Sequence, residues 1–247
     1  MNLYKLVKIT TLFAALILLI QNSYGKDSLD VLSKFLFYKN KYKVECANEK
    51  ITDNFGNGYD SLYGTRNMRV ILHGVAYRGG ANNFYNKNQK RDNHNPLPQE
   101  GLINLTNQGF SKAVYLYSKN FSSSEKVVVS NSGKDTLEYL QNSGMNRNDL
   151  KSIMMLVLDV IRNKDKGPIY LHCWNGWHQS GYISAAILMQ FCGLTNEEAL
   201  KYWNQNTDGV NKGYENVKRL VNTFVPFNDI KIDNKTKETI CPCLEKK

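Results

Sequence analysis

The chain has 247 residues, of which 42% are hydrophobic, and this length suits one domain of ordinary size with appendages. The apolar fraction, together with 15 tyrosines, 10 phenylalanines and 3 tryptophans, excludes global disorder. A formal charge of +10 is compatible with a nucleic acid, an anionic membrane or a phosphorylated partner, and it selects none of them. Five cysteines are an odd number, so at least one is unpaired within the chain in an oxidising compartment.

The start of the chain is typical of a secretory signal peptide. Two lysines precede an unbroken apolar run at residues 12–20, and the small residues Ser23 and Gly25 stand before an expected cleavage at Lys26. The apolar run is shorter than the roughly 20 residues that a membrane-spanning helix needs. We therefore expect a secreted or periplasmic protein that has no stable membrane anchor once residues 1–25 are removed.

The mature chain is expected to begin with an N-terminal extension, residues 26–63, whose first half shows the apolar spacing of a helix. A strand is expected at 68–75, closed by a turn at Gly79-Gly80. Residues 81–100 form a long polar stretch, and a loop of this length inside a domain is usually functional.

Helices and strands alternate in the remainder of the chain. The expected helices cover residues 102–109, 149–163, 181–192, 195–204 and 214–224. The expected strands cover residues 113–117, 127–129 and 169–173. Asn148 or Asp149 is the expected cap of the second helix, and Thr195 with Glu198 forms a capping box. The alternation predicts an α/β fold with a central, mostly parallel sheet flanked by helices. We assign this domain to residues 64–228 and a polar C-terminal tail to 229–247.

The segment 169–181 carries the most specific chemistry in the sequence. A buried strand ends at Cys173, a six-residue loop with one glycine, Gly176, follows, and a helix begins at Ser180. Such a loop can turn its backbone N–H groups inward at the positive end of the helix and form an anion-binding nest. The same field favours the thiolate of Cys173 as a nucleophile, and the Ser180 hydroxyl can hydrogen-bond that thiolate.

These residues resemble the signature loop of the cysteine-dependent phosphatases, H-C-x-x-G-x-x-R-S/T-G. The matching positions are His172, Cys173, Gly176, Ser180 and Gly181. Dual-specificity phosphatases are the most similar branch in length, and further patterns of that family resemble residues 76–80, 105–117 and 194–202. The resemblance implies a phosphatase-like fold and a two-step reaction: the thiolate attacks phosphorus, and the phosphocysteine is then hydrolysed without a metal or another cofactor.

The resemblance also implies roles for individual residues. Cys173 is the expected nucleophile, with Ser180 and Asp92 as further catalytic candidates, and His172 is expected to orient the loop. The candidate phosphate-binding residues are Trp174, Asn175, Gly176, Trp177, His178, Gln179 and Arg78. No metal site is expected.

Gln179 stands where that family has its arginine, six residues after the cysteine. Arginine holds two phosphate oxygens with a charged planar fork, whereas glutamine is neutral. The missing positive charge could come from His178 or from an arginine of another segment. The candidate arginines are Arg66, Arg69, Arg78 and Arg91.

The general acid is the second departure. The family places an aspartate roughly 30 residues before the cysteine to protonate the leaving oxygen. Residues 141–148 contain no carboxylate here. The alternatives are Asp149, which is more simply explained as a helix cap, the more distant Asp135, and Asp92 in the long polar stretch.

Two hypotheses therefore remain. The first is an exported phosphatase that hydrolyses a phosphate monoester of a phosphoprotein or a small metabolite. The second is a catalytically inactive pseudophosphatase that binds phosphate or a phosphoprotein. A nucleic-acid partner is not expected, because the basic residues are scattered. Of the cysteines, Cys173 should stay free, Cys192 should be a core thiol, and Cys46 should pair with Cys241 or Cys243.

Overall fold

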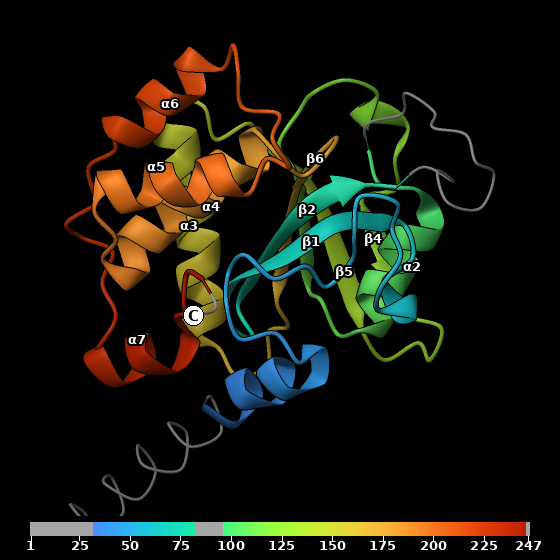
Figure 1. Ribbon diagram of the computed structural model, residues 1–247. Coiled ribbons are helices and arrows are strands. Elements are labelled where there is room, and N and C mark those ends of the chain that lie inside the picture. Colours follow the sequence, from blue (N-terminus) through green and yellow to red (C-terminus); the bar gives the residue numbers. More distant parts are fainter. Residues whose placement is uncertain (1–31, 83–95, 246–247) are drawn as a thin grey trace, which may run out of the picture.

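A six-stranded sheet forms the centre of the computed structural model, which describes residues 32–82 and 96–245 (Figure 1). The strands lie in the order β1-β2-β6-β3-β5-β4. Their bounds are β1 Thr65–Leu72, β2 Ala76–Ala81, β3 Lys112–Tyr115, β4 Val127–Val129, β5 Thr136–Gln141 and β6 Ile169–Cys173. The pairs β2–β6, β6–β3 and β3–β5 are parallel, and the edge strands β1 and β4 pair in the antiparallel sense. The prediction of an α/β fold with a mostly parallel sheet is confirmed.

Helices cover both faces of this sheet. Their bounds are α2 Gln99–Asn107, α3 Arg147–Arg162, α4 Gln179–Ile187, α5 Asn196–Gln205, α6 Glu215–Asn222 and α7 Asn234–Ile240. Residues 32–42 are also helical, two short 3₁₀ turns occur at Asp60–Leu62 and Phe121–Ser123, and α4 continues as a π-helical turn at Leu188–Cys192. Helices α3 to α6 pack on one face, while α2 and the tyrosines of the segment 32–42 pack on the other (Figure 1).

Alternation along β6 explains how one strand serves both layers. Ile169 and Leu171 belong to the core under α3 and α4, whereas Tyr170 belongs to the core under α2. Side chains of a strand point to opposite faces in turn, so His172 lies on the same side as Tyr170. All five residues of β6 are buried, as expected for a central parallel strand.

The expected turn at Gly79-Gly80 is wrong, because both glycines lie inside β2. The chain reverses earlier, at Gly74, which has φ +67° and lies between β1 and β2. The glycine pair serves close packing instead: a Cβ on Gly80 would lie 2.3 Å from the carbonyl oxygen of Trp174. Two adjacent glycines often mark a turn, but here they lie within a sheet at a point where other atoms of the chain approach closely.

Two helix expectations also need correction. The cap of α3 is Asn146, whose side chain accepts from the N–H of Asp149, and neither Asn148 nor Asp149 is the cap. Residues 234–240 of the expected polar tail form α7, and Ile240 at its end is fully buried. The capping box of Thr195 and Glu198 is confirmed at the start of α5.

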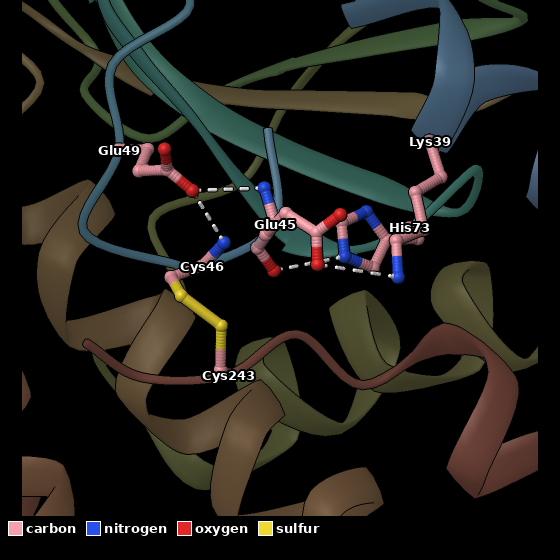
Figure 2. The surroundings of a disulfide bond; sticks show 6 residues. All are labelled: Lys39, Glu45, Cys46, Glu49, His73 and Cys243. Carbon is pink, nitrogen blue, oxygen red and sulfur yellow. Dashed lines mark hydrogen bonds and ion pairs between the residues drawn. A yellow bond between two sulfur atoms is a disulfide. The ribbon is translucent and has the colours of Figure 1, made fainter. Parts of the chain in front are cut away.

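Two disulfide bonds hold the C-terminal segment. Cys46 pairs with Cys243, as the sequence allowed, and the N–H groups of Glu45 and Cys46 both donate to the Glu49 carboxylate at 2.8 Å beside it (Figure 2). The expectation of a core thiol at Cys192 is wrong, because it is bonded to Cys241. Cys173 is the free cysteine, as predicted.

The expected signal peptide, residues 1–25, lies outside the described residues, and so does Asp92. Across residues 32–82 and 96–245, none of the helices has the length and apolar character needed to cross a membrane.

Candidate active site

Cys173 lies at the carboxyl end of β6 and lines a cavity of about 750 Å³. Its side chain is 8% exposed, and its Sγ lies 3.4 Å from the Oγ of Ser180. Ser180 belongs to the first turn of α4 and is fully buried. The predicted pairing of a free thiol with a serine hydroxyl is therefore present, and the thiol lines a cavity.

The loop after Cys173 is held against β2 by its backbone. Gly176 has φ +77°, and a Cβ there would lie 2.6 Å from the carbonyl carbon of Gly79. The N–H of Ala81 donates to the Trp174 carbonyl at 3.0 Å, and the Asn67 amide donates to the Asn175 carbonyl at 2.9 Å. The loop is thus held against β2 by backbone hydrogen bonds, and only a glycine fits at position 176.

The backbone amides at the start of α4 are available to a ligand. The N-cap residue, His178, makes no side-chain capping hydrogen bond. Within the described part of the chain, the N–H groups of residues 177–179 have no acceptor. Unsatisfied N–H groups at a helix N-terminus attract an anion, because their dipoles point the same way. This arrangement fits the expected anion nest.

Gln179 lines the cavity, but its side chain already has a partner. Its Nε2 donates to the Ser143 carbonyl at 2.8 Å, which ties the first turn of α4 to the loop after β5. The Ser143 hydroxyl in turn donates to the Asp149 carboxylate at 3.1 Å. Gln179 therefore positions a wall of the cavity, and it brings no positive charge to it.

His172 is part of a buried relay of hydrogen bonds. Its Nδ1 donates to the Cys173 carbonyl at 3.1 Å, because a carbonyl can only accept. Its Nε2 then accepts from the Tyr139 hydroxyl at 2.8 Å, and that hydroxyl accepts from the N–H of Leu97. Burial lowers the pKa of His172 to about 3, so the ring is neutral at pH 7. This geometry fits the loop-orienting role expected for His172.

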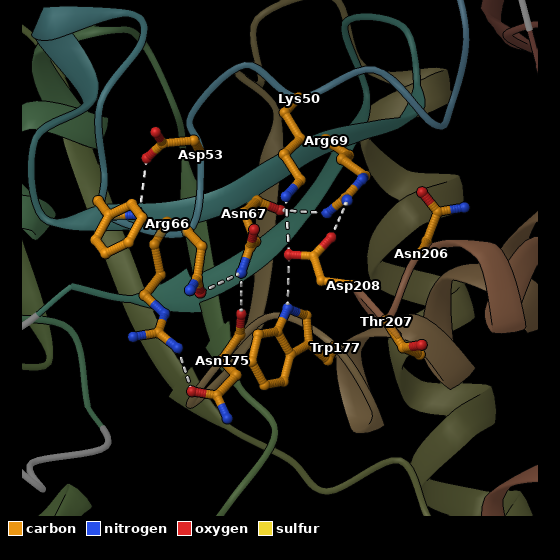
Figure 3. A network of polar contacts seen from close by, with 12 residues as sticks. Lys50, Asp53, Arg66, Asn67, Arg69, Asn175, Trp177, Asn206, Thr207 and Asp208 are labelled. Atoms are coloured by element: carbon orange, nitrogen blue, oxygen red, sulfur yellow. Dashed lines mark hydrogen bonds and ion pairs between the residues drawn. The ribbon is translucent and has the colours of Figure 1, made fainter. Parts of the chain in front are cut away.

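Three buried arginines, Arg66, Arg69 and Arg78, lie close to the loop but do not line the cavity. Figure 3 shows two of them, Arg66 and Arg69. Arg66 donates to the Asn175 side chain, and Arg69 donates to Asp208 at 3.3 Å. Arg78 donates to the carbonyl oxygens of Trp177 and Asn206. None of these arginines lines the cavity, and Arg91 lies outside the described residues.

The aromatic residues of the loop point in different directions. Trp174 lines the cavity, whereas Trp177 is not among the lining residues. The Trp177 Nε1 donates to Asp208 at 3.2 Å (Figure 3). The His178 ring stacks on Tyr214 at 3.5 Å between centroids, and its Nε2 donates to the Val210 carbonyl. Burial lowers the pKa of His178 below its ordinary value. Burial therefore disfavours the charged form of His178, which is the form that could stand in for the missing arginine.

Carboxylates are absent from the cavity wall formed by the described residues. Asp149 accepts from Asn146 and Ser143, so its carboxylate serves the start of α3. Asp135 directly precedes β5, and β5 runs parallel to β3 and hence to β6. Asp135 therefore lies at the amino ends of the parallel strands, whereas Cys173 lies at their carboxyl ends. Asp92 stays a prediction for the general acid.

Several cavity residues were missed by sequence reasoning. They are Leu116, Tyr117, Lys119, Ser143, Tyr214 and Asn216. Most of them follow β3 or β5 directly, and ligands of parallel sheets bind beyond the carboxyl ends of the strands. The strand β5 itself was not expected, so the signal at Ser143 was lost with it. Lys119 is the single lysine or arginine among the cavity-lining residues of the described chain.

The chain is similar to known proteins in structure but not in sequence. No protein-family model matches the chain, and no curated protein matches its sequence. Among solved structures, a crystal structure of Tk-PTP in a mutant form is similar, with a TM-score of 0.40 and 17% identity. The alignment covers 60% of this chain and 90% of that chain. So distant a likeness carries no information on activity or substrate, which depend on the geometry of the site.

Proposed function

We propose that this protein binds a phosphate monoester in the loop 173–179 and hydrolyses it through Cys173. The observation that carries the proposal is a free thiol that lines a cavity, 3.4 Å from a buried serine hydroxyl and beside the N-terminus of α4. The amides of residues 177–179 would hold the phosphate oxygens. The volume of about 750 Å³ is in the usual range for a small-molecule site.

The reaction would proceed in two displacements on phosphorus. The Cys173 thiolate forms a P–S bond while the ester P–O bond breaks, and the leaving oxygen takes a proton from an acid. Asp92 remains the candidate for this acid. Water then attacks the phosphocysteine, the P–S bond breaks, and inorganic phosphate leaves as the thiolate is restored. The residues need neither a metal nor another cofactor for these steps.

A second candidate function is phosphate or phosphoprotein binding without turnover. The bond from Gln179 to the Ser143 carbonyl favours it, because this side chain is committed to the cavity wall. The lack of carboxylates in the described wall favours it as well. Both candidates share the ligand and differ only in whether the phosphocysteine forms and decays.

One set of assays separates the two candidates. Mature protein starting at residue 26 is incubated with p-nitrophenyl phosphate and with phosphopeptides, beside Cys173→Ser, Asp92→Asn and Gln179→Arg variants. An active wild type should lose all turnover in Cys173→Ser and about a hundredfold in Asp92→Asn, since general acid catalysis contributes this much. Turnover that persists in Cys173→Ser would exclude the cysteine mechanism.

The Gln179→Arg variant tests the inactive alternative. A silent wild type that gains turnover with this substitution would establish a binding protein whose catalysis was lost at one position. An active wild type should gain at most about a hundredfold from the new guanidinium, the usual effect of one charged donor on a transition state. Thermal unfolding of each variant checks that the fold is kept.

We also propose that the protein is exported. Its two disulfide bonds support this, because disulfides persist in oxidising compartments. The measurement is N-terminal sequencing of the protein recovered outside the cytoplasm, which should start near residue 26. A mature protein that keeps residues 1–25 would contradict the proposed cleavage.

A further inference from the structure

Arg78 is buried directly behind the candidate phosphate loop. It lies on β2 and is 0% exposed. One terminal nitrogen donates to the Trp177 carbonyl at 3.3 Å and the other donates to the Asn206 carbonyl at 2.9 Å. The guanidinium also lies against the first turn of α4, because a Cβ on Gly181 would be 2.9 Å from it.

The charge of Arg78 has no counter-ion among the described residues. Its contacts there are carbonyl oxygens and the ring of Tyr202, and its Nε has no hydrogen-bond acceptor. Arg69 is buried on the neighbouring strand to a similar degree, yet it is paired with Asp208. A buried cation without an anion is costly, so its presence calls for a charge that arrives with a ligand.

The contact with Trp177 also sets the direction of a loop amide. The C=O and the N–H of a trans peptide point in opposite directions. Because the Trp177 carbonyl faces Arg78, the N–H of His178 in the same peptide faces away from it. That N–H is one of the amides without an acceptor in the described structure. Arg78 thus holds a donor of the nest in place from behind.

We propose that Arg78 supplies the positive charge of the oxyanion site, in place of the loop arginine that Gln179 replaces. This inference rests on the proposed binding of a phosphate monoester in the loop 173–179. Arg78 acts through the loop as a positioning residue and through its unscreened charge, and it does not touch the ligand. The site therefore takes a tetrahedral oxyanion that the neutral amides hold directly while the cation lies one layer behind.

Lys119 is the competing source of charge. It lines the cavity, but it is exposed, and water and salt screen an exposed charge. A buried charge is screened much less, so the two sources differ in their dependence on ionic strength. This difference makes them separable in the unmodified protein.

The test measures phosphate binding at Cys173 itself. Mature protein is alkylated with iodoacetamide, the rate is followed by intact mass, and inorganic phosphate is titrated as a protecting ligand. Arg78→Gln should weaken protection at least about tenfold, whereas Arg78→Lys, which keeps the charge, should stay within about threefold of wild type. Lys50→Gln, which removes a partly exposed cation near Trp177, is the matched control and should change protection less than about twofold.

Each outcome of these measurements either supports or overturns the role proposed for Arg78. A folded Arg78→Gln variant with wild-type protection would overturn it, and so would a loss in Lys119→Gln that is absent in Arg78→Gln. If Arg78→Gln does not fold, the wild type decides: protection that falls by more than about tenfold between low and high salt indicates an exposed cation and overturns it. A wild type that phosphate does not protect at all refutes the proposed function, and the inference with it.

Discussion

His172 and Cys173 are adjacent in sequence, but their side chains lie in different surroundings. The ring of His172 is enclosed by Tyr115, Tyr139 and Tyr170, which stack around it with centroids 5.1 to 5.7 Å away. The next side chain, on the other face of the strand, opens to the cavity. A strand end between two packed layers thus places a buried neutral ring and a free, cavity-lining thiol on adjacent residues.

The buried histidines make stability depend on pH. Burial lowers the pKa of His172 to about 3 and that of His73 to about 4. The unfolded chain binds protons at these positions below about pH 6.5 while the folded chain does not, so stability falls as the pH drops from there. At pH 5 each histidine should cost about 2 kcal/mol of unfolding free energy. Urea denaturation between pH 5 and pH 7 measures this.

The His73→Gln variant tests whether the pH dependence of stability comes from the buried histidines. His73→Gln should reduce the slope of stability against pH, because it removes one of the two groups. The His73 Nε2 donates one hydrogen bond to the Glu45 carbonyl, and the side-chain amide of glutamine can donate to the same oxygen. Equal stability of the wild type at pH 5 and pH 7 would show that these rings are not buried as described.

The loop 173–179 and strand β2 approach each other so closely that glycines are required between them. A Cβ on Gly80 would lie 2.3 Å from the Trp174 carbonyl oxygen of the loop 173–179, and a Cβ on Gly79 would lie 2.2 Å from the Tyr170 hydroxyl. For this reason the glycine pair, which resembles a turn locally, belongs to a strand. Only the pairing of β2 with β6 and its loop reveals the requirement.

The Gly176→Ala substitution measures this fit. Its φ of +77° disfavours alanine, and the new Cβ would lie 2.6 Å from the Gly79 carbonyl carbon. We expect a loss of about 3 kcal/mol or more in unfolding free energy, together with loss of phosphate protection of Cys173. The control is Gly133→Ala, at φ +71° with nothing within 4 Å, which should lose only about 1 kcal/mol. Equal losses in both variants would mean that the close approach is unimportant.

At the scale of the whole molecule, the C-terminal segment fastens distant parts of the chain together. Cys241 is bonded to Cys192, at the end of the helix that follows the loop 173–179, and Cys243 is bonded to Cys46 of the N-terminal extension. The N–H of Ala47 donates to the Cys243 carbonyl, and the N–H of His73 donates to the Ile240 carbonyl, both at 2.7 Å. The extension and the expected tail are therefore packed parts of the folded structure.

Removal of each disulfide should cost stability according to its span. The Cys46–Cys243 bond joins residues 197 apart and the Cys192–Cys241 bond joins residues 49 apart. Closure of the longer loop removes more entropy from the unfolded chain, so the Cys46→Ser/Cys243→Ser variant should lose about 1 kcal/mol more than the Cys192→Ser/Cys241→Ser variant. Urea denaturation of the two variants compares them. A larger loss from the shorter loop would show that native packing, and not chain entropy, dominates.

Local patterns were sufficient for the central elements. The strand at 169–173, the capping box at Thr195 and the free thiol at Cys173 follow from neighbours a few residues apart, and the structure confirms them. The short strand β5 and the short helix α7 were missed because little in their sequence separates them from exposed loops. Long-range packing stabilises them: Leu137 and Tyr139 enter the core under α2, and Ile240 enters the other core.

The spacing of Cys173, Gly176 and Ser180 alone predicted where the thiol, the loop and the helix start would lie, because all three belong to one strand–loop–helix unit. The charge of the site could not be predicted in this way. Arg78 contacts Trp177 from 99 residues away, and Gln179 contacts Ser143 from 36 residues away. Sheet order and burial decide these meetings, since they determine which distant side chain is enclosed behind the loop and which is left to line the cavity.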